Sequence, residues 1–160
     1  MAHTEPLTPT GTVAKRVREV RKRRGLTAEQ LALKLREQGI PWDRYTVNKL
    51  ENGKRQNISL TEWLALAEVL NVAPVHLLTP TDTVEGDQYQ VTPERAVPVA
   101  HAREWVRGHD YLDGADPRSF HAETPREEWN RNWLPLDQDA FQELLKAFPL
   151  VTRGDQGGQH

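Results

Sequence analysis

Residues 25–55 have the sequence GLTAEQLALKLREQGIPWDRYTVNKLENGKR. Thr27 stands three residues before Gln30, which is the spacing of a capping box. In that arrangement the threonine hydroxyl accepts a hydrogen bond from the glutamine backbone N–H, and the glutamine side chain reaches back to the threonine backbone. The spacing predicts a helix that starts at Thr27 and ends near Glu37. The side chains expected on its buried face are Leu31, Ala32 and Leu35.

A turn and a second capped helix follow. Gly39 tolerates the backbone of a helix end, and Pro41 cannot continue a helix. Asp43 is a good N-cap, so a helix is predicted over residues 43–52. Its inward-facing positions are Val47 and Leu50.

Two further helical patterns flank this pair. Before it, valines recur at i, i+4 and i+7 from Val13 to Val20, which predicts an amphipathic helix that ends near Gly25. After it, Ser59 and Glu62 have the spacing of a second capping box and predict another helix. The apolar stripe expected on that helix consists of Leu60, Trp63, Leu64, Ala67 and Leu70.

A short fifth helix completes the pattern. Asn71 is a suitable left-handed stop for the preceding helix, and Pro74 is a suitable first residue for a helix over residues 74–78. Five helices with short connections predict an all-α unit over residues 11–80.

The chain changes character after Pro80. Residues 81–92 are polar and acidic without periodicity, which predicts a linker. Residues 93–150 are acidic and contain aromatic side chains, and we expect a partly helical, partly extended appendage that serves dimerisation, packing or partner binding. Its weak helical patterns lie at 93–107, 125–134 and 137–148. Residues 151–160 are Gly-rich and polar, which predicts a flexible tail.

The net charge of −2 conceals an asymmetry between the two halves of the chain. Residues 1–80 have 13 Lys and Arg against 8 Asp and Glu, a net charge of +5, whereas residues 81–160 have 8 against 15, a net charge of −7. Residues 11–60 alone have 13 against 5, a net charge of +8. A basic front half favours a polyanion as the partner.

Several classes of protein do not fit the sequence. The chain has no cysteine, which excludes disulfides, thiolate zinc sites and cysteine catalysis. No apolar run approaches the roughly 20 residues that span a bilayer, so we expect a cytoplasmic protein without a membrane partner. Neither a phosphate-binding loop nor a paired-histidine metal motif occurs, so no enzyme activity, cofactor or metal is expected.

Four blocks together resemble a known family. They are residues 25–32 (GLTAEQLA), 46–55 (TVNKLENGKR), 58–64 (ISLTEWL) and 67–72 (AEVLNV). Their order is similar to that of the Xre family of lambda-repressor-like (Cro/repressor-type) helix-turn-helix proteins. The resemblance covers about residues 10–78 and implies a compact five-helix lambda-repressor-like bundle that binds double-stranded DNA.

The resemblance also implies roles for single residues. In the family, the second helix of the pair presents side chains to base edges, and the matching positions are Arg44, Tyr45, Asn48 and Lys49. For Lys49 a phosphate contact is an open alternative. The positions expected to bind phosphate are Gln30, Thr46, Asn52, Gly53, Lys54 and Arg55. Arg21 and Glu51 match a structural ion pair beneath the DNA-binding face, with two separately solvated charges as the alternative.

The sequence departs from the family pattern in two places. Ala28 stands where the family commonly has a glutamine that contacts phosphate, and Gln30 is the substitute that the sequence offers. The turn before Asp43 is about two residues longer than the short form of the family, so the register of the following helix can differ by one position. We expect Trp42 in this turn to fill space in the core and not to stack on a base.

The function expected from these features is sequence-specific transcriptional regulation by a bacterial or phage repressor that contacts the major groove with residues 43–52. The alternative is an antitoxin or adaptor whose acidic C-terminal segment binds a protein partner while the N-terminal domain autoregulates its operon. The family commonly binds two-fold DNA sites as dimers, so a homodimer and a protein partner for the C-terminal segment both stay open.

Overall fold

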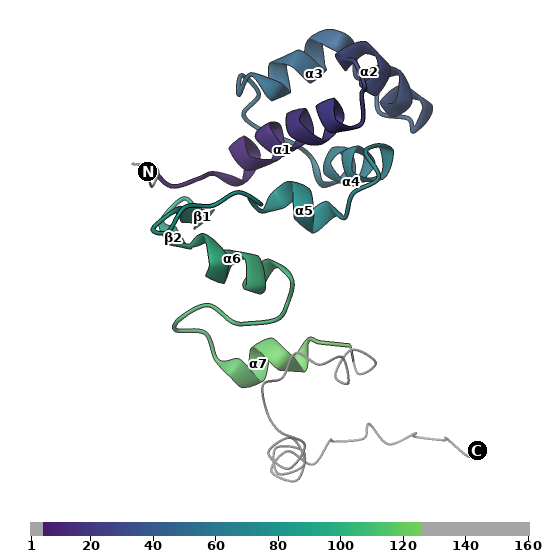
Figure 1. Ribbon diagram of the computed structural model, residues 1–160. Helices are drawn as coiled ribbons and strands as arrows, with labels where there is room; N and C mark the ends of the chain where they lie inside the picture. Colours follow the sequence, from purple (N-terminus) through teal and green to yellow (C-terminus); the bar gives the residue numbers. More distant parts are fainter. Residues whose placement is uncertain (1–4, 126–160) are drawn as a thin grey trace, which may run out of the picture. The chain divides into compact units, whose positions relative to one another are not determined.

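The computed structural model of the protein describes residues 5–125, which form seven helices and two strands. In chain order these elements are α1 (Pro9–Arg23), α2 (Ala28–Glu37), α3 (Arg44–Glu51), α4 (Leu60–Val69), α5 (Pro74–Leu78), β1 (Gln88–Thr92), β2 (Arg95–Pro98), α6 (Val99–Val106) and α7 (Pro117–Ala122). The chain divides into two compact units, residues 1–115 and 116–160. The first unit contains α1 to α6 and both strands, and the described part of the second contains α7 (Figure 1).

The five helices predicted within residues 11–80 are α1 to α5, and local caps set their ends. Thr27 and Ser59 each form the predicted capping box with the third residue of the helix they start. Asp43 caps α3 as predicted, and Asn71 has a φ of 51° just after α4. The predicted fold class, a five-helix bundle followed by a partly helical and partly extended segment, is therefore confirmed.

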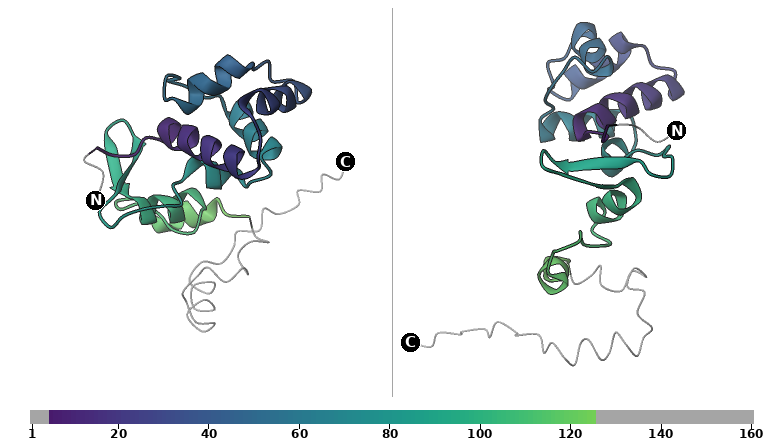
Figure 2. Two further views of the ribbon diagram at one scale, coloured as in Figure 1. Left: turned by 45° about the horizontal axis from the view of Figure 1, so that its top comes forward. Right: turned by 90° about the vertical axis from the view of Figure 1, so that its left-hand side faces the viewer.

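The core of the helical region is built around α1, which contacts both α3 and α5 (Figure 2). Val17 of α1, Leu31 of α2 and Leu50 of α3 are fully buried in it. Trp42, in the turn between α2 and α3, is buried in the same core, which confirms the prediction for this residue. α3 is therefore held against the rest of the bundle by its own apolar face and by the turn that precedes it.

The apolar stripe predicted for α4 is wrong at two positions. The side chains of Leu60 and Leu64 are 74% and 52% exposed, whereas Leu66 and Leu70 are buried. A helix with 3.6 residues per turn places Leu64 about 160° around its axis from Leu66. The face that α4 turns to the core is thus centred nearer Leu66 and Leu70 than the stripe implied.

An antiparallel hairpin of β1 and β2 occupies residues 88–98, of which the sequence predicted the first five as linker. Tyr89 lies opposite Val97 in the hairpin, and Leu7 forms a parallel bridge to Tyr89. The Tyr89 hydroxyl donates a hydrogen bond to the Leu78 carbonyl oxygen at 2.7 Å, and burial raises the pKa of this phenol. β2 follows β1 after only two residues, but Leu7, the other partner of β1, lies far earlier in the chain.

A second, smaller core joins the hairpin to α6. Its buried residues are Tyr89, Val97, Val99, Ala102 and Leu112. α6 begins six residues after the start of the predicted pattern at 93–107, because residues 95–98 belong to β2. The patterns predicted at 125–134 and 137–148 lie, apart from Pro125, outside the described residues, as does the predicted tail. No helix within residues 5–125 is long and apolar enough to cross a bilayer.

Candidate nucleic-acid interface

α3 is oriented by a cap at its start and by buried side chains on one face. The Asp43 carboxylate accepts hydrogen bonds from the backbone N–H and the hydroxyl of Thr46, each at 2.7 Å. The hydroxyl hydrogen bond is the main reason that the pKa of Asp43 lies below its ordinary value. Val47 and Leu50 are fully buried, so the opposite face of α3 points away from the core.

That opposite face, here called the outer face of α3, carries the four residues predicted to contact bases. They are Arg44, Tyr45, Asn48 and Lys49. At about 100° per residue they lie within an arc of about 140° around the helix axis. Asn48 is half-buried and the other three are exposed. No hydrogen bond or ion pair joins these side chains to other residues within 5–125, so their donors are available to a ligand.

Gln30 lies at the start of α2 with one end of its side chain occupied. Its Oε1 accepts a hydrogen bond from the Thr27 backbone N–H at 2.8 Å, while its own backbone N–H donates to the Thr27 hydroxyl at 3.1 Å. The residue is exposed, and an amide side chain has two further donors on Nε2. The capping role and a phosphate contact through Nε2 are therefore compatible.

The turn after α3 presents one cation outward and one inward. Asn52 caps α3, and Gly53 has a φ of 68°, which favours glycine. Lys54 is exposed. The Arg55 guanidinium lies 4.5 Å from the centre of the Trp42 ring. The Arg55 side chain is thus engaged within the protein, and Lys54 is the exposed cation of this turn.

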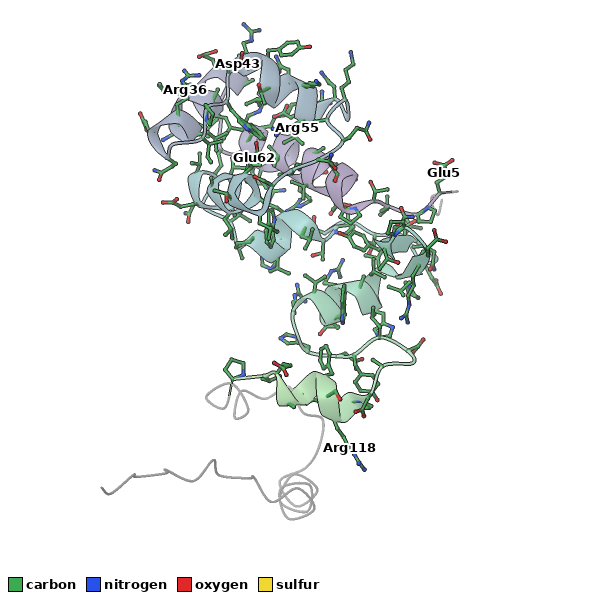
Figure 3. The ribbon with its side chains drawn as sticks, turned by 180° about the vertical axis from the view of Figure 1, so that it is seen from behind. Glu5, Arg36, Asp43, Arg55, Glu62 and Arg118 are labelled. Carbon is green, nitrogen blue, oxygen red and sulfur yellow. The ribbon has the colours of Figure 1, made fainter. Side chains whose placement is uncertain are left out.

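Trp42, Arg55 and Glu62 form a cluster that ties both ends of α3 to α4, here called the Trp42 cluster. Glu62 Oε1 accepts hydrogen bonds from Trp42 Nε1 at 2.9 Å and from Arg55 Nη2 at 2.7 Å. Glu62 Oε2 accepts from the Ser59 backbone N–H at 2.8 Å. Figure 3 shows Arg55 and Glu62 next to each other in the bundle.

The electrostatics of the Trp42 cluster favour a charged carboxylate. Burial alone would raise the pKa of Glu62, but the hydrogen bonds from Ser59, Arg55 and Trp42 outweigh it and hold the pKa below its ordinary value. Arg55 Nη1 is buried without a hydrogen-bond partner among the described residues. The flat face of the Arg55 guanidinium lies on the Trp42 ring, and its Nη2 donates a hydrogen bond to Glu62. These contacts fix the turn before α3 and the turn after it relative to each other.

Arg21 and Glu51 lie together beneath the outer face of α3. Their side chains form two parallel hydrogen bonds, Nε to Oε1 at 2.6 Å and Nη2 to Oε2 at 2.8 Å. Arg21 Nη1 also donates to the Leu26 carbonyl oxygen at 2.7 Å. The side chains are 12% and 5% exposed, and the hydrogen bond to Glu51 raises the pKa of Arg21. The pair connects α1 to the last turn of α3, which is the place that the sequence-based expectation gave it.

Two features of this region were not foreseen from the sequence. The Thr46 hydroxyl donates a hydrogen bond to the Asp43 carboxylate. Arg36 donates to the Trp42 carbonyl oxygen at 2.9 Å and so holds the turn between α2 and α3. The sequence did contain a sign of the Trp42 cluster. A buried indole N–H needs a hydrogen-bond acceptor, and Glu62 was already predicted at the start of a helix.

Within residues 5–125 no three His, Asp or Glu side chains are grouped as they would be around a metal ion.

Comparison with known proteins agrees with this geometry. A family model described as "Helix-turn-helix" (HTH_3) matches residues 17–77, from the second half of α1 to α5. No curated protein and no solved structure matches the chain. The matched range contains the outer face of α3, the Trp42 cluster and the pair of Arg21 with Glu51.

Proposed function

We propose that this protein, in which residues 17–77 are a helix-turn-helix domain of the Xre and Cro type, is a repressor that recognises a specific DNA sequence with α3. The domain type implies DNA binding. The observation that carries the proposal is the outer face of α3, where four polar or charged side chains lie in one arc without partners among the described residues. A single helix fits the major groove, where all four base pairs can be distinguished.

Each part of the interface has a distinct role in this proposal. Arg44, in the first turn of α3, is suited to a bidentate hydrogen bond with guanine O6 and N7. Lys54, in the turn after α3, contributes a phosphate contact without sequence preference. Gln30, at the start of α2, donates to phosphate through Nε2. Repression follows from occupancy, because a protein bound across a promoter excludes other proteins from the same groove.

Substitution of Arg44 and of Lys54 should have different signatures. A binding site is first selected from random duplex DNA with the full chain. Arg44→Ala should then weaken binding to that site by about 1–3 kcal/mol and remove the preference at one base pair. Lys54→Ala should weaken binding to all sequences alike and reduce the slope of log K against log salt by about one unit. Titration of single-base variants of the site at two salt concentrations measures both effects.

Lys15→Ala is the control with the same loss of charge. Lys15 lies on α1 beside the N-terminal residues 5–8, and its variant should bind DNA almost as the unmodified protein does. A uniform loss of affinity in Arg44→Ala would show that the register of α3 differs and would move base contact to Tyr45 or Asn48. If selection enriches no sequence, or transcription from a promoter with the selected site does not fall, the proposed repressor function is wrong.

A further inference from the structure

Five arginine side chains line a hollow on the side of α1 that faces α5 and α6. They are Arg16, Arg23, Arg24, Arg103 and Arg107. The hollow has a volume of about 530 Å³, which is in the range of small-molecule sites. None of the described residues that line it is an aspartate or a glutamate, and none comes from α2, α3 or the turn after α3. We call it the arginine hollow.

Several of these guanidinium groups are held in place by backbone carbonyl oxygens. Arg16, whose side chain is 5% exposed, donates from Nε to the His76 carbonyl at 3.0 Å. Arg24 donates to the carbonyls of Leu70 and Asn71, at 3.2 and 3.0 Å. Arg103 donates to the carbonyl of Pro80 at 2.7 Å. A guanidinium has five N–H donors, so these bonds orient each group and leave other donors for a ligand.

The positive charge in the hollow is only partly neutralised. Arg16 pairs with Glu19 at 2.6 Å, and Arg107 pairs with Glu104 at 3.1 Å. Arg23, Arg24 and Arg103 have no ion pair with a carboxylate among residues 5–125. Three guanidinium groups around one hollow repel each other unless an anion lies between them.

The arginines that line the hollow come from two parts of the chain that are far apart in sequence, and one of these parts is otherwise acidic. Residues 81–160 have a net charge of −7, yet Arg103 of α6 and Arg107, the residue after the end of α6, both line the hollow. The N-terminal helix α1 contributes Arg16, Arg23 and the neighbouring Arg24. In Figures 1 and 2, α3 and α6 lie on opposite sides of α1, so the hollow is separate from the outer face of α3.

We propose that the arginine hollow binds a small anion with at least two phosphate or carboxylate groups. An arginine guanidinium can donate two parallel hydrogen bonds to two oxygen atoms of such a group. Charge-assisted hydrogen bonds of this kind are stronger than hydrogen bonds between neutral groups. Three guanidinium groups without carboxylate partners suit a ligand of two or more negative charges better than a single phosphate. The ligand would join α1 of the helix-turn-helix region to α6.

Calorimetric titration of the full chain with pyrophosphate tests this proposal, with inorganic phosphate at equal ionic strength as the comparison. We expect one pyrophosphate per chain, bound at least about tenfold more tightly than phosphate. Arg23→Gln and Arg103→Gln should each weaken pyrophosphate binding by about tenfold, because each removes a charged donor. The Arg23 side chain has no hydrogen bond or ion pair among the described residues, so its variant should keep the circular dichroism spectrum and melting temperature.

Two controls separate the hollow from the DNA interface and from general attraction. Arg44→Ala should leave pyrophosphate affinity unchanged, and Arg23→Gln should leave the DNA sequence preference unchanged. Equal loss of pyrophosphate binding in Lys15→Gln and Arg23→Gln would overturn the proposal, since attraction would then be non-specific. It would also be overturned if pyrophosphate did not bind and Arg23→Gln instead lowered the salt slope of DNA binding, because the hollow would then contact DNA phosphate.

Discussion

Glu51→Ala is expected to lower the melting temperature of the protein by about 12–24 °C. The substitution removes the partner of Arg21, whose guanidinium stays buried beneath α3 with one remaining hydrogen bond, to the Leu26 carbonyl. Loss of one member of a buried ion pair costs about 3 kcal/mol, and each kcal/mol shifts the melting temperature of a domain of this size by about 4–8 °C. Thermal unfolding followed by circular dichroism measures the change.

An exposed ion pair on the same bundle provides the control. Glu29 and Arg36 are 3.2 Å apart, with side chains 58% and 40% exposed. Glu29→Ala should cost less than about 1 kcal/mol, because exposed pairs contribute little in water. Equal melting temperatures for Glu51→Ala and Glu29→Ala would contradict the structural role given to the buried pair. At a temperature where Glu51→Ala is folded, its DNA affinity should still be reduced, because the last turn of α3 is no longer tied to α1.

Trp42→Ala should have a comparable or larger effect. Removal of a buried tryptophan side chain costs about 3–5 kcal/mol through lost burial and the cavity left behind. Here it also takes away the ring on which Arg55 lies and one of the donors to Glu62. Both turns that flank α3 lose a fixed contact, so discrimination between the selected site and its single-base variants should fall together with the melting temperature.

Trp42→Phe separates the core role of this residue from a direct role at DNA. Phenylalanine keeps an aromatic ring beneath Arg55 but loses the N–H donor to Glu62 and part of the buried ring volume, so we expect a loss of about 1–2 kcal/mol in stability and little change in DNA affinity. Normal stability with a large loss of DNA affinity would instead assign Trp42 to base stacking. Guanidinium denaturation and DNA titration of the same preparations distinguish these results.

Features that depend on neighbouring residues could be predicted from the sequence. Thr27, Asp43 and Ser59 cap helices because their hydroxyl or carboxylate groups lie within three residues of the N–H groups they accept from. The left-handed backbone of Asn71 is a similarly local preference. α7 could have been predicted on the same grounds, since Asp116 caps it and Pro117 is its first residue, but it lies between the helical patterns predicted at 93–107 and 125–134.

Features set by residues far apart in the chain could not be predicted in this way. β1 pairs with the adjacent β2 and also with Leu7, and this second partner, far earlier in the chain, is not evident from residues 88–92. Arg55 sits in a basic turn typical of phosphate binding, and only the positions of Trp42 and Glu62 show that its guanidinium lies inward. The arginine hollow likewise requires α1 and α6 to lie near each other, which charge patterning along the chain does not indicate.

Methylation interference on the selected DNA site tests most directly whether α3 lies in the major groove. Dimethyl sulfate methylates guanine at N7, which faces the major groove, and adenine at N3, which faces the minor groove. Lightly methylated DNA is mixed with the full chain, and methylated positions are compared between bound and free fractions. We predict that guanines methylated at N7 are depleted from the bound fraction, that Arg44→Ala loses this depletion at one guanine, and that Lys54→Ala keeps it. Equal guanine patterns in the two fractions, or interference at adenine N3 alone, would contradict major-groove recognition by α3.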